Sequence, residues 1–168
     1  MGYGARIDST RPIHYGRYAA KMRASALPGC VTGFVMMSPG KDEIDFEWVG
    51  KNAATTQTNY YVKGQLDYTK GFIANNGYDI SQSFHEYAVE WQLDHISWFI
   101  DGNLIRTVDT SSNIGLPAEP GNLIFSLWDG GAGLPGTSDW AGGKIDWSSP
   151  LLENGATYSE IEYVSYTC

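Results

Sequence analysis

The stretch Tyr87-Ala-Val-Glu-Trp-Gln-Leu-Asp-His-Ile-Ser-Trp-Phe-Ile-Asp-Gly-Asn-Leu-Ile-Arg-Thr-Val108 contains three segments in which apolar residues alternate with other residues. Asp101-Gly102 separates the second segment from the third, and Asp-Gly between alternating apolar segments is a strong signal for a β-hairpin. We therefore predict antiparallel strands at 87–91, 96–100 and 104–108. By the same alternation, Tyr87, Trp91 and Trp98 are expected to face a buried core.

Similar strand-forming segments follow one another through most of the chain. They lie at 16–24, 31–37, 43–48, 56–62, 122–128 and 157–166. The 20 glycines, 11 tyrosines and 6 tryptophans suit turns and strands, and few segments show helical periodicity. About nine strands of this length predict an all-β fold, a two-sheet antiparallel sandwich.

Two irregular stretches, 111–121 and 129–143, interrupt this pattern and could form the rims of a site. The glycine-rich run that begins at Asp129 resembles a phosphate-binding loop only if a helix follows it. The sequence suggests no helix there, so we expect a flexible loop that carries Trp140.

Composition limits the possible partners. The 168 residues carry 11 basic and 19 acidic side chains, and no basic run occurs, so neither nucleic acid nor an anionic membrane surface is an expected partner. We expect one domain over residues 1–168, with no membrane-spanning segment and no signal peptide within this chain. Neither a metal site nor a cofactor is expected from the two cysteines. Cys30 and Cys168 could form one disulfide or remain thiols.

Three acids occupy alternate positions in the segment Glu43-Ile-Asp-Phe-Glu-Trp48. In a strand, Glu43, Asp45 and Glu47 share one face, while Ile44 and Trp48 point to the other. Like charges on one face repel, so this arrangement calls for a reason. Catalysis by the three acids is one explanation. Two alternatives stay open, an exposed acidic strand and a calcium site built from oxygen ligands.

Retaining glycoside hydrolysis needs two carboxyl groups about 5–5.5 Å apart. The Cα atoms of Glu43 and Glu47 should lie roughly 13 Å apart in a straight strand, and their long side chains can close most of that gap. Asp45 lies between them and can form a hydrogen bond with either. Mutual repulsion would raise the pKa of one group while another stays ionised, which provides both protonation states.

Glu43-Ile-Asp-Phe-Glu47 resembles the E-x-D-x-E signature of glycoside hydrolase family 16. Within that family the surroundings are most similar to the fungal chitin-to-glucan crosslinking transglycosylases of the cell wall. The resemblance extends from about Gly4 to the C-terminus and includes Ser9-Thr-Arg11, Val31-Thr-Gly-Phe34, Gln57-Thr-Asn-Tyr-Tyr61, Phe84-His-Glu-Tyr87, Trp128-Asp-Gly-Gly131 and Asp139-Trp-Ala-Gly-Gly143.

This resemblance implies a β-jelly roll with a concave substrate cleft. It also implies that Glu43 is the nucleophile, Glu47 the general acid/base and Asp45 an assisting carboxylate. The expected activity is cleavage of chitin or β-glucan, with transfer to a glucan acceptor or to water, by a secreted, extracellular or wall-associated enzyme. Members usually carry several dozen residues before the segment matching Gly4, so the resemblance implies a domain shortened at its N-terminal side.

Five further residues are candidates for binding sugar. Gln57, Asn59 and Tyr61 alternate along one strand and should share a face, where amides and a phenol suit sugar hydroxyls. Trp128 and Trp140 could stack on sugar rings. A polar strand face without ligand contacts, and core burial of either Trp, stay open as alternatives.

Two other functions are also compatible with the sequence. The first is a noncatalytic carbohydrate-binding module on the same sandwich. The second is a fragment that associates with itself through exposed sheet edges.

Overall fold

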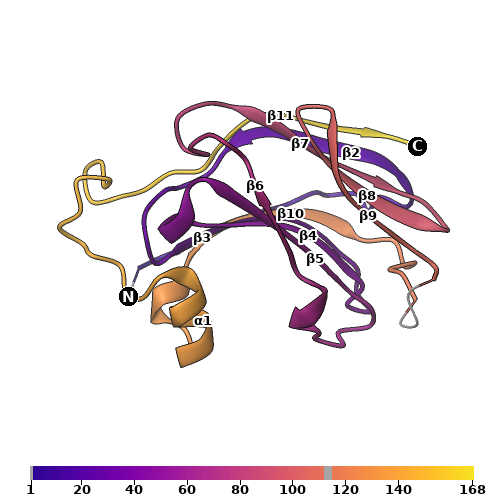
Figure 1. Cartoon of the computed structure of the whole chain (residues 1–168), viewed down its shortest axis with the longest axis horizontal. Helices are drawn as coiled ribbons and strands as arrows, with labels where there is room; N and C mark the ends of the chain where they lie inside the picture. The colour runs from indigo at the N-terminus through magenta and orange to yellow at the C-terminus, as the bar shows by residue number, and fades with distance from the viewer. Residues whose placement is uncertain (1, 112–114) are drawn as a thin grey trace.

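The computed structural model describes residues 2–111 and 115–168, so part of the predicted irregular stretch 111–121 lies outside the described residues. Two antiparallel sheets stack face to face (Figure 1). One sheet has the order β1-β10-β3-β4-β5-β6 and the other β11-β2-β7-β8-β9. The strands are β1 (Ala5–Asp8), β2 (Gly16–Arg23), β3 (Cys30–Met37), β4 (Glu43–Val49), β5 (Thr55–Tyr61), β6 (Phe72–Asn75), β7 (His85–Trp91), β8 (His95–Ile100), β9 (Asn103–Asp109), β10 (Asn122–Asp129) and β11 (Glu160–Thr167).

Alternation along the strands builds the core between the sheets. In β4, Phe46 and Trp48 are fully buried against the second sheet, where Tyr87 meets the Trp48 ring at 4.6 Å between centroids. Trp91 and Trp98 are also fully buried. The predicted sandwich and these predicted core positions are therefore confirmed, because the same period of two that marks a strand also sorts its side chains by face.

The predictions missed two strands and one helix. Strands β1 and β6 have four residues each and lie at sheet edges. The expectation of a flexible loop without a helix after Asp129 is wrong, because a 3₁₀ turn (Gly130–Ala132) and the helix α1 (Pro135–Ala141) follow it. Pro135 stands at the first helical position, and Gly142 ends the helix in the left-handed conformation with φ of 105°.

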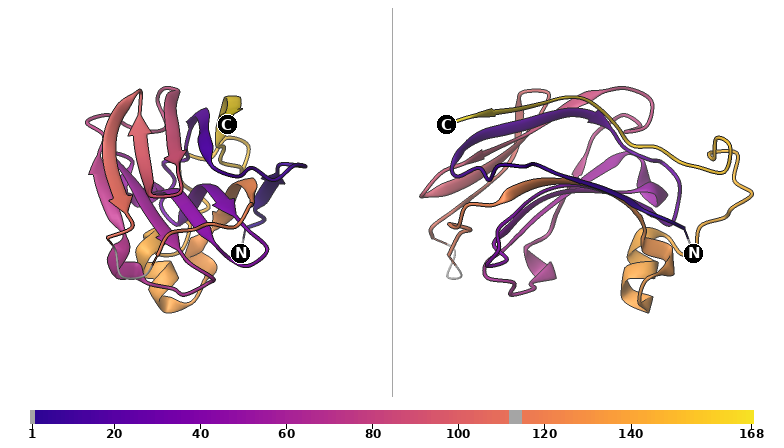
Figure 2. Two further views of the ribbon diagram at one scale, coloured as in Figure 1. Left: turned by 90° about the vertical axis from the view of Figure 1, so that its right-hand side faces the viewer. Right: turned by 180° about the vertical axis from the view of Figure 1, so that it is seen from behind.

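The contacts between sheets show which strands face each other. Phe34 of β3 meets Tyr18 of β2, and Tyr60 of β5 meets Trp98 of β8, with ring centroids 5.7 and 6.5 Å apart. The edge strands β1 and β11 must therefore lie on the same side of the sandwich, as the left view of Figure 2 shows.

At this side the interior of the sandwich is exposed. Ile7 of β1 and Val164 of β11 pair with residues whose side chains face the core, yet they remain 65% and 46% exposed. We call the surface formed by the inner-facing side chains of β1 and β11 the open flank.

Both cysteines are free thiols. Cys30 is buried and Cys168 is exposed at the end of the chain. Burial, together with the charge of Asp129, raises the pKa of Cys30 to about 11. Within residues 2–111 and 115–168, no helix has the length and apolar character needed to cross a membrane.

Candidate active site

Strand β4 lies near the centre of the six-stranded sheet, between β3 and β5. The sheet is curved, and helix α1 projects from its concave face, as seen from behind in Figure 2. We call Glu43, Asp45 and Glu47 the acid row, and Gln57, Asn59 and Tyr61 the polar row. Each acid has a polar-row residue directly opposite on β5, in the pairs Glu43 with Tyr61, Asp45 with Asn59, and Glu47 with Gln57.

The middle acid is the most buried member of the acid row. Asp45 is only 1% exposed. Burial raises its pKa well above the ordinary value, and the negative charges of Glu43 and Glu47 raise it further. A protonated Asp45 can donate a hydrogen bond to the Glu43 carboxylate, an arrangement that also favours the proton on Asp45.

The two glutamates differ in their surroundings. Burial raises the pKa of Glu43, but the hydrogen bond with Asp45 opposes this effect and favours the ionised form. Burial and the charge of Glu43 raise the pKa of Glu47 to about 7. The site can therefore hold a carboxylate at Glu43 and a carboxylic acid at Glu47 near neutral pH, two different roles within one strand.

Hydrogen bonds order the polar row. The Asn59 side chain donates from Nδ2 to the Tyr61 hydroxyl at 2.9 Å and accepts from the backbone N–H of Tyr60, also at 2.9 Å. Burial raises the pKa of Tyr61, and the acid row raises it further. Tyr61 therefore stays a neutral phenol, able to donate its hydroxyl proton to a carboxylate or a sugar oxygen.

The two candidate stacking residues pack against each other. Their ring centroids lie 6.2 Å apart, and both rings rest on an apolar cluster that includes Val31 and Val49. Trp140 belongs to helix α1 rather than to a loop, which corrects the prediction. Its indole N–H donates to the Gln57 Oε1 at 2.9 Å. Neither Trp128 nor Trp140 is fully buried, so each retains surface that a ligand could contact.

Gly33 was not singled out from the sequence, yet it neighbours the acid row. In the sheet register it lies between Glu47 of β4 and Ser126 of β10. A Cβ atom at this position would lie 2.8 Å from the Ser126 hydroxyl oxygen. Glycine within an apolar strand is a signal for close approach of another group, and here it leaves the sheet surface beside Glu47 free of a side chain.

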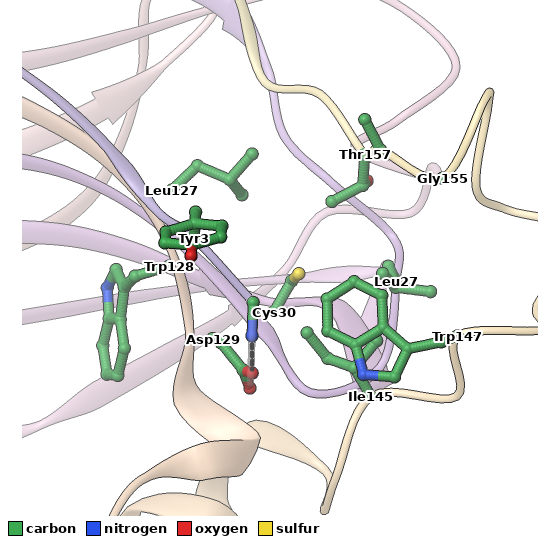
Figure 3. Close-up of a pocket in the computed structure, with 12 residues that line it drawn as sticks. Tyr3, Leu27, Cys30, Leu127, Trp128, Asp129, Ile145, Trp147, Gly155 and Thr157 are labelled. Atoms are coloured by element: carbon green, nitrogen blue, oxygen red, sulfur yellow. Dashed lines mark hydrogen bonds between the residues drawn. The ribbon is translucent and has the colours of Figure 1, made fainter.

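Two cavities are lined by residues other than the acid row. One of about 520 Å³ opens at the end of the sandwich, where Tyr3, Cys30 and Trp147 contribute to its lining (Figure 3). The Gly2 N–H donates to the Asp129 carboxylate at 2.8 Å at its border. A second cavity, of about 360 Å³, is lined in part by Trp128.

Among the residues that the structure describes, no group of three or more histidine, cysteine, aspartate or glutamate side chains is arranged to hold a metal ion.

A two-sheet sandwich whose concave face carries a row of carboxyl groups beside amides, a phenol and indoles is typical of the class of proteins that act on carbohydrate. Residues 2–149 match the model for the glycosyl hydrolases of family 16. The chain belongs to this family.

Individual relatives agree with this assignment. Crh-like protein 2 of Aspergillus fumigatus is 39% identical over 97% of this chain, and a beta-glucanase of Paenibacillus polymyxa is 35% identical over 95%. The chain spans 40% of the length of the first and 62% of the second. Among solved structures, an apo Crh5 transglycosylase matches with a TM-score of 0.85 at 29% identity, covering 96% of this chain and 66% of that one.

Proposed function

We propose that this chain is a retaining glycosidase or transglycosylase that cleaves chitin or β-glucan and transfers the released chain to a glucan acceptor or to water. The acid row is the observation that carries the proposal, because it combines a carboxylate supported by Asp45 with a carboxylic acid whose pKa is about 7. One buried and two half-buried carboxyl groups in a row are costly to a sandwich that only binds sugar.

In the first half of the proposed reaction, Glu43 attacks the anomeric carbon while Glu47 donates its proton to the departing glycosidic oxygen. The bond to the leaving group breaks as the glycosyl–Glu43 ester forms. In the second half, the Glu47 carboxylate takes a proton from a sugar hydroxyl or from water. The activated oxygen displaces Glu43, so the anomeric configuration is retained and both glutamates return to their starting states.

Asp45 has an assisting role in this scheme. Its hydrogen bond to Glu43 lowers the pKa of the nucleophile, and its own burial keeps it protonated. The polar row lies one strand away, where Tyr61 and Asn59 can bind hydroxyl groups of the sugar. Trp128 and Trp140 would provide aromatic surfaces for the apolar faces of sugar rings.

The choice of polysaccharide rests on similarity. The fungal relatives are Crh-like proteins, and a second solved structure that resembles this chain is a Crh5 transglycosylase in complex with NAG, with a TM-score of 0.86. We therefore propose a chitin-type or β-glucan donor and a glucan acceptor. Such a polysaccharide substrate lies outside the cell, so the proposal includes an extracellular or wall-associated location for the enzyme.

The test is product analysis with labelled chitin oligosaccharides as donor and β-glucan oligosaccharides as acceptor. The wild type should yield transferred or hydrolysed products of retained anomeric configuration, and Glu43→Gln should yield none. Glu153→Gln, at an exposed position, is the matched control. Products of inverted configuration would refute the mechanism. Sugar binding without turnover in both wild type and Glu43→Gln would instead support a carbohydrate-binding module.

A second experiment separates the two glutamates. Glu47→Gln should retain turnover of substrates with activated leaving groups, which need no protonation. Complete loss of turnover on those substrates would contradict the acid role of Glu47.

A further inference from the structure

Arg106 is a charged residue directed into the sandwich behind the acid row. It lies on β9 opposite Trp98 of β8, whose side chain is fully buried in the core. Its own side chain therefore points toward the six-stranded sheet and is half-buried. A guanidinium in such a place needs several hydrogen-bond acceptors, because an unpaired buried charge is strongly destabilising.

The acceptors come from the opposite sheet. One guanidinium nitrogen donates to the backbone oxygen and the hydroxyl of Thr58, at 2.8 and 2.9 Å. The other donates to the backbone oxygen of Lys70 at 2.6 Å. Thr58 stands between Gln57 and Asn59, so Arg106 anchors the part of β5 that carries the polar row.

A second contact leads to β4. The guanidinium lies 4.7 Å from the centroid of the Trp98 ring, and the Trp98 indole N–H donates to the backbone oxygen of Asp45 at 3.1 Å. Arg106 thus contacts the Trp98 ring, which is hydrogen-bonded to the backbone of Asp45. Both strands that define the site are tied to β8 and β9 by this one group of side chains.

The charge of Arg106 also acts on the acid row. Among the causes that shift the pKa of Asp45, the positive charge of Arg106 is the one that lowers it. The other ionisable groups around this cluster are Tyr60 and Lys70, with the Lys70 ammonium 4.3 Å from the Tyr60 ring centroid. Tyr18 and Tyr61 complete the surroundings of Asp45.

We propose that Arg106 is a positioning residue for the acid row, which it holds in place through Thr58 and Trp98 and toward which it directs its positive charge. This inference rests on the proposed glycosidase function for its kinetic consequence. It adds a residue of the second sheet that touches neither the substrate nor the reacting atoms.

Two substitutions separate charge from geometry. Arg106→Gln removes the charge, so the Asp45 carboxyl should hold its proton to higher pH, and the lost hydrogen bonds to Thr58 and Lys70 should lower kcat. Arg106→Lys keeps the charge but not the planar guanidinium, so it should restore the wild-type Asp45 titration with a lower melting temperature. Arg17→Gln removes the same charge from an exposed position on β2 and should leave both the titration and kcat unchanged.

An unchanged kcat together with an unchanged Asp45 titration in Arg106→Gln, with only stability reduced, would overturn the inference. If Arg106→Gln does not fold, Arg106→Met takes its place, because its apolar side chain can still cover Trp98.

A titration of the side-chain carboxyl groups by carbon-13 NMR tests the same inference without turnover. The Asp45 titration should move to higher pH in Arg106→Gln and return in Arg106→Lys, and an unchanged titration overturns the inference. If the wild type turns over no glycan, the proposed function fails, while this titration still decides the role of Arg106.

Discussion

Replacing Glu47 with glutamine should stabilise the fold at alkaline pH and have a much smaller effect near pH 5. The native structure raises the pKa of Glu47 from an ordinary value of 4.5 to about 7, mainly through burial. Between these two values the unfolded chain has released the proton while the native protein still holds it. The free energy of unfolding must therefore fall as pH rises through this range, and the full cost is present above pH 7.

The magnitude follows from the same two values. A difference of about 2.5 pH units corresponds to about 3 kcal/mol at pH 9, and about 1 kcal/mol of this cost is already present at pH 5. Glutamine has a similar shape and no charge. Glu47→Gln should therefore gain about 2 kcal/mol more at pH 9 than at pH 5, or about 4–8 °C in melting temperature for a chain of this size.

Urea denaturation of wild type and variant at pH 5, 7 and 9 measures this difference. Glu153→Gln removes one glutamate charge at an exposed position and should show no comparable dependence on pH. An equal change in stability for Glu47→Gln at pH 5 and pH 9 would refute the reasoning, because it would mean that the native structure does not shift the pKa of Glu47.

Three further predictions concern the site and the open flank. Trp140→Phe removes the indole donor to Gln57 and should lower kcat/KM on oligosaccharides about fivefold, the equivalent of one hydrogen bond; unchanged kinetics would show that this bond does not shape the site. Gly33→Ala places a methyl group beside Glu47 and should lower kcat/KM about tenfold, an equivalent of about 1.4 kcal/mol, with little loss of melting temperature; full activity would mean that substrate does not approach the sheet there. Sedimentation velocity should show association that increases with protein concentration, and Ile7→Lys should reduce it; a wild type that stays monomeric at every concentration would contradict association through the open flank.

Alternation alone predicted most of the fold. Strand β4 was found because its apolar residues and its acids occupy opposite faces, and the same feature predicted the acid row. Strands β1 and β6 could not be found in this way, since their four residues are mostly exposed and carry no alternating apolar signal. The ends of helix α1 were marked by Pro135 and Gly142, but the glycine-rich run before them favoured a loop.

The contacts behind the acid row could not be predicted from the sequence. Trp98 and Asp45 are 53 residues apart, and Trp140 and Gln57 are 83 apart. Periodicity shows which face of a strand a side chain occupies, but it does not show which residue of the other sheet lies opposite. For this reason Trp98 could be predicted as a core residue while its hydrogen bond to the strand of the acid row could not.

The different environments of the two thiols give the molecule one convenient point of chemical attachment. Cys30 is buried and resists ionisation, whereas Cys168 is exposed next to the end of β11, on the sheet opposite the acid row. A maleimide reagent at neutral pH should therefore modify Cys168 selectively. Protein coupled to a solid support through this thiol would keep its concave face directed away from the point of attachment and accessible to long, insoluble glycans.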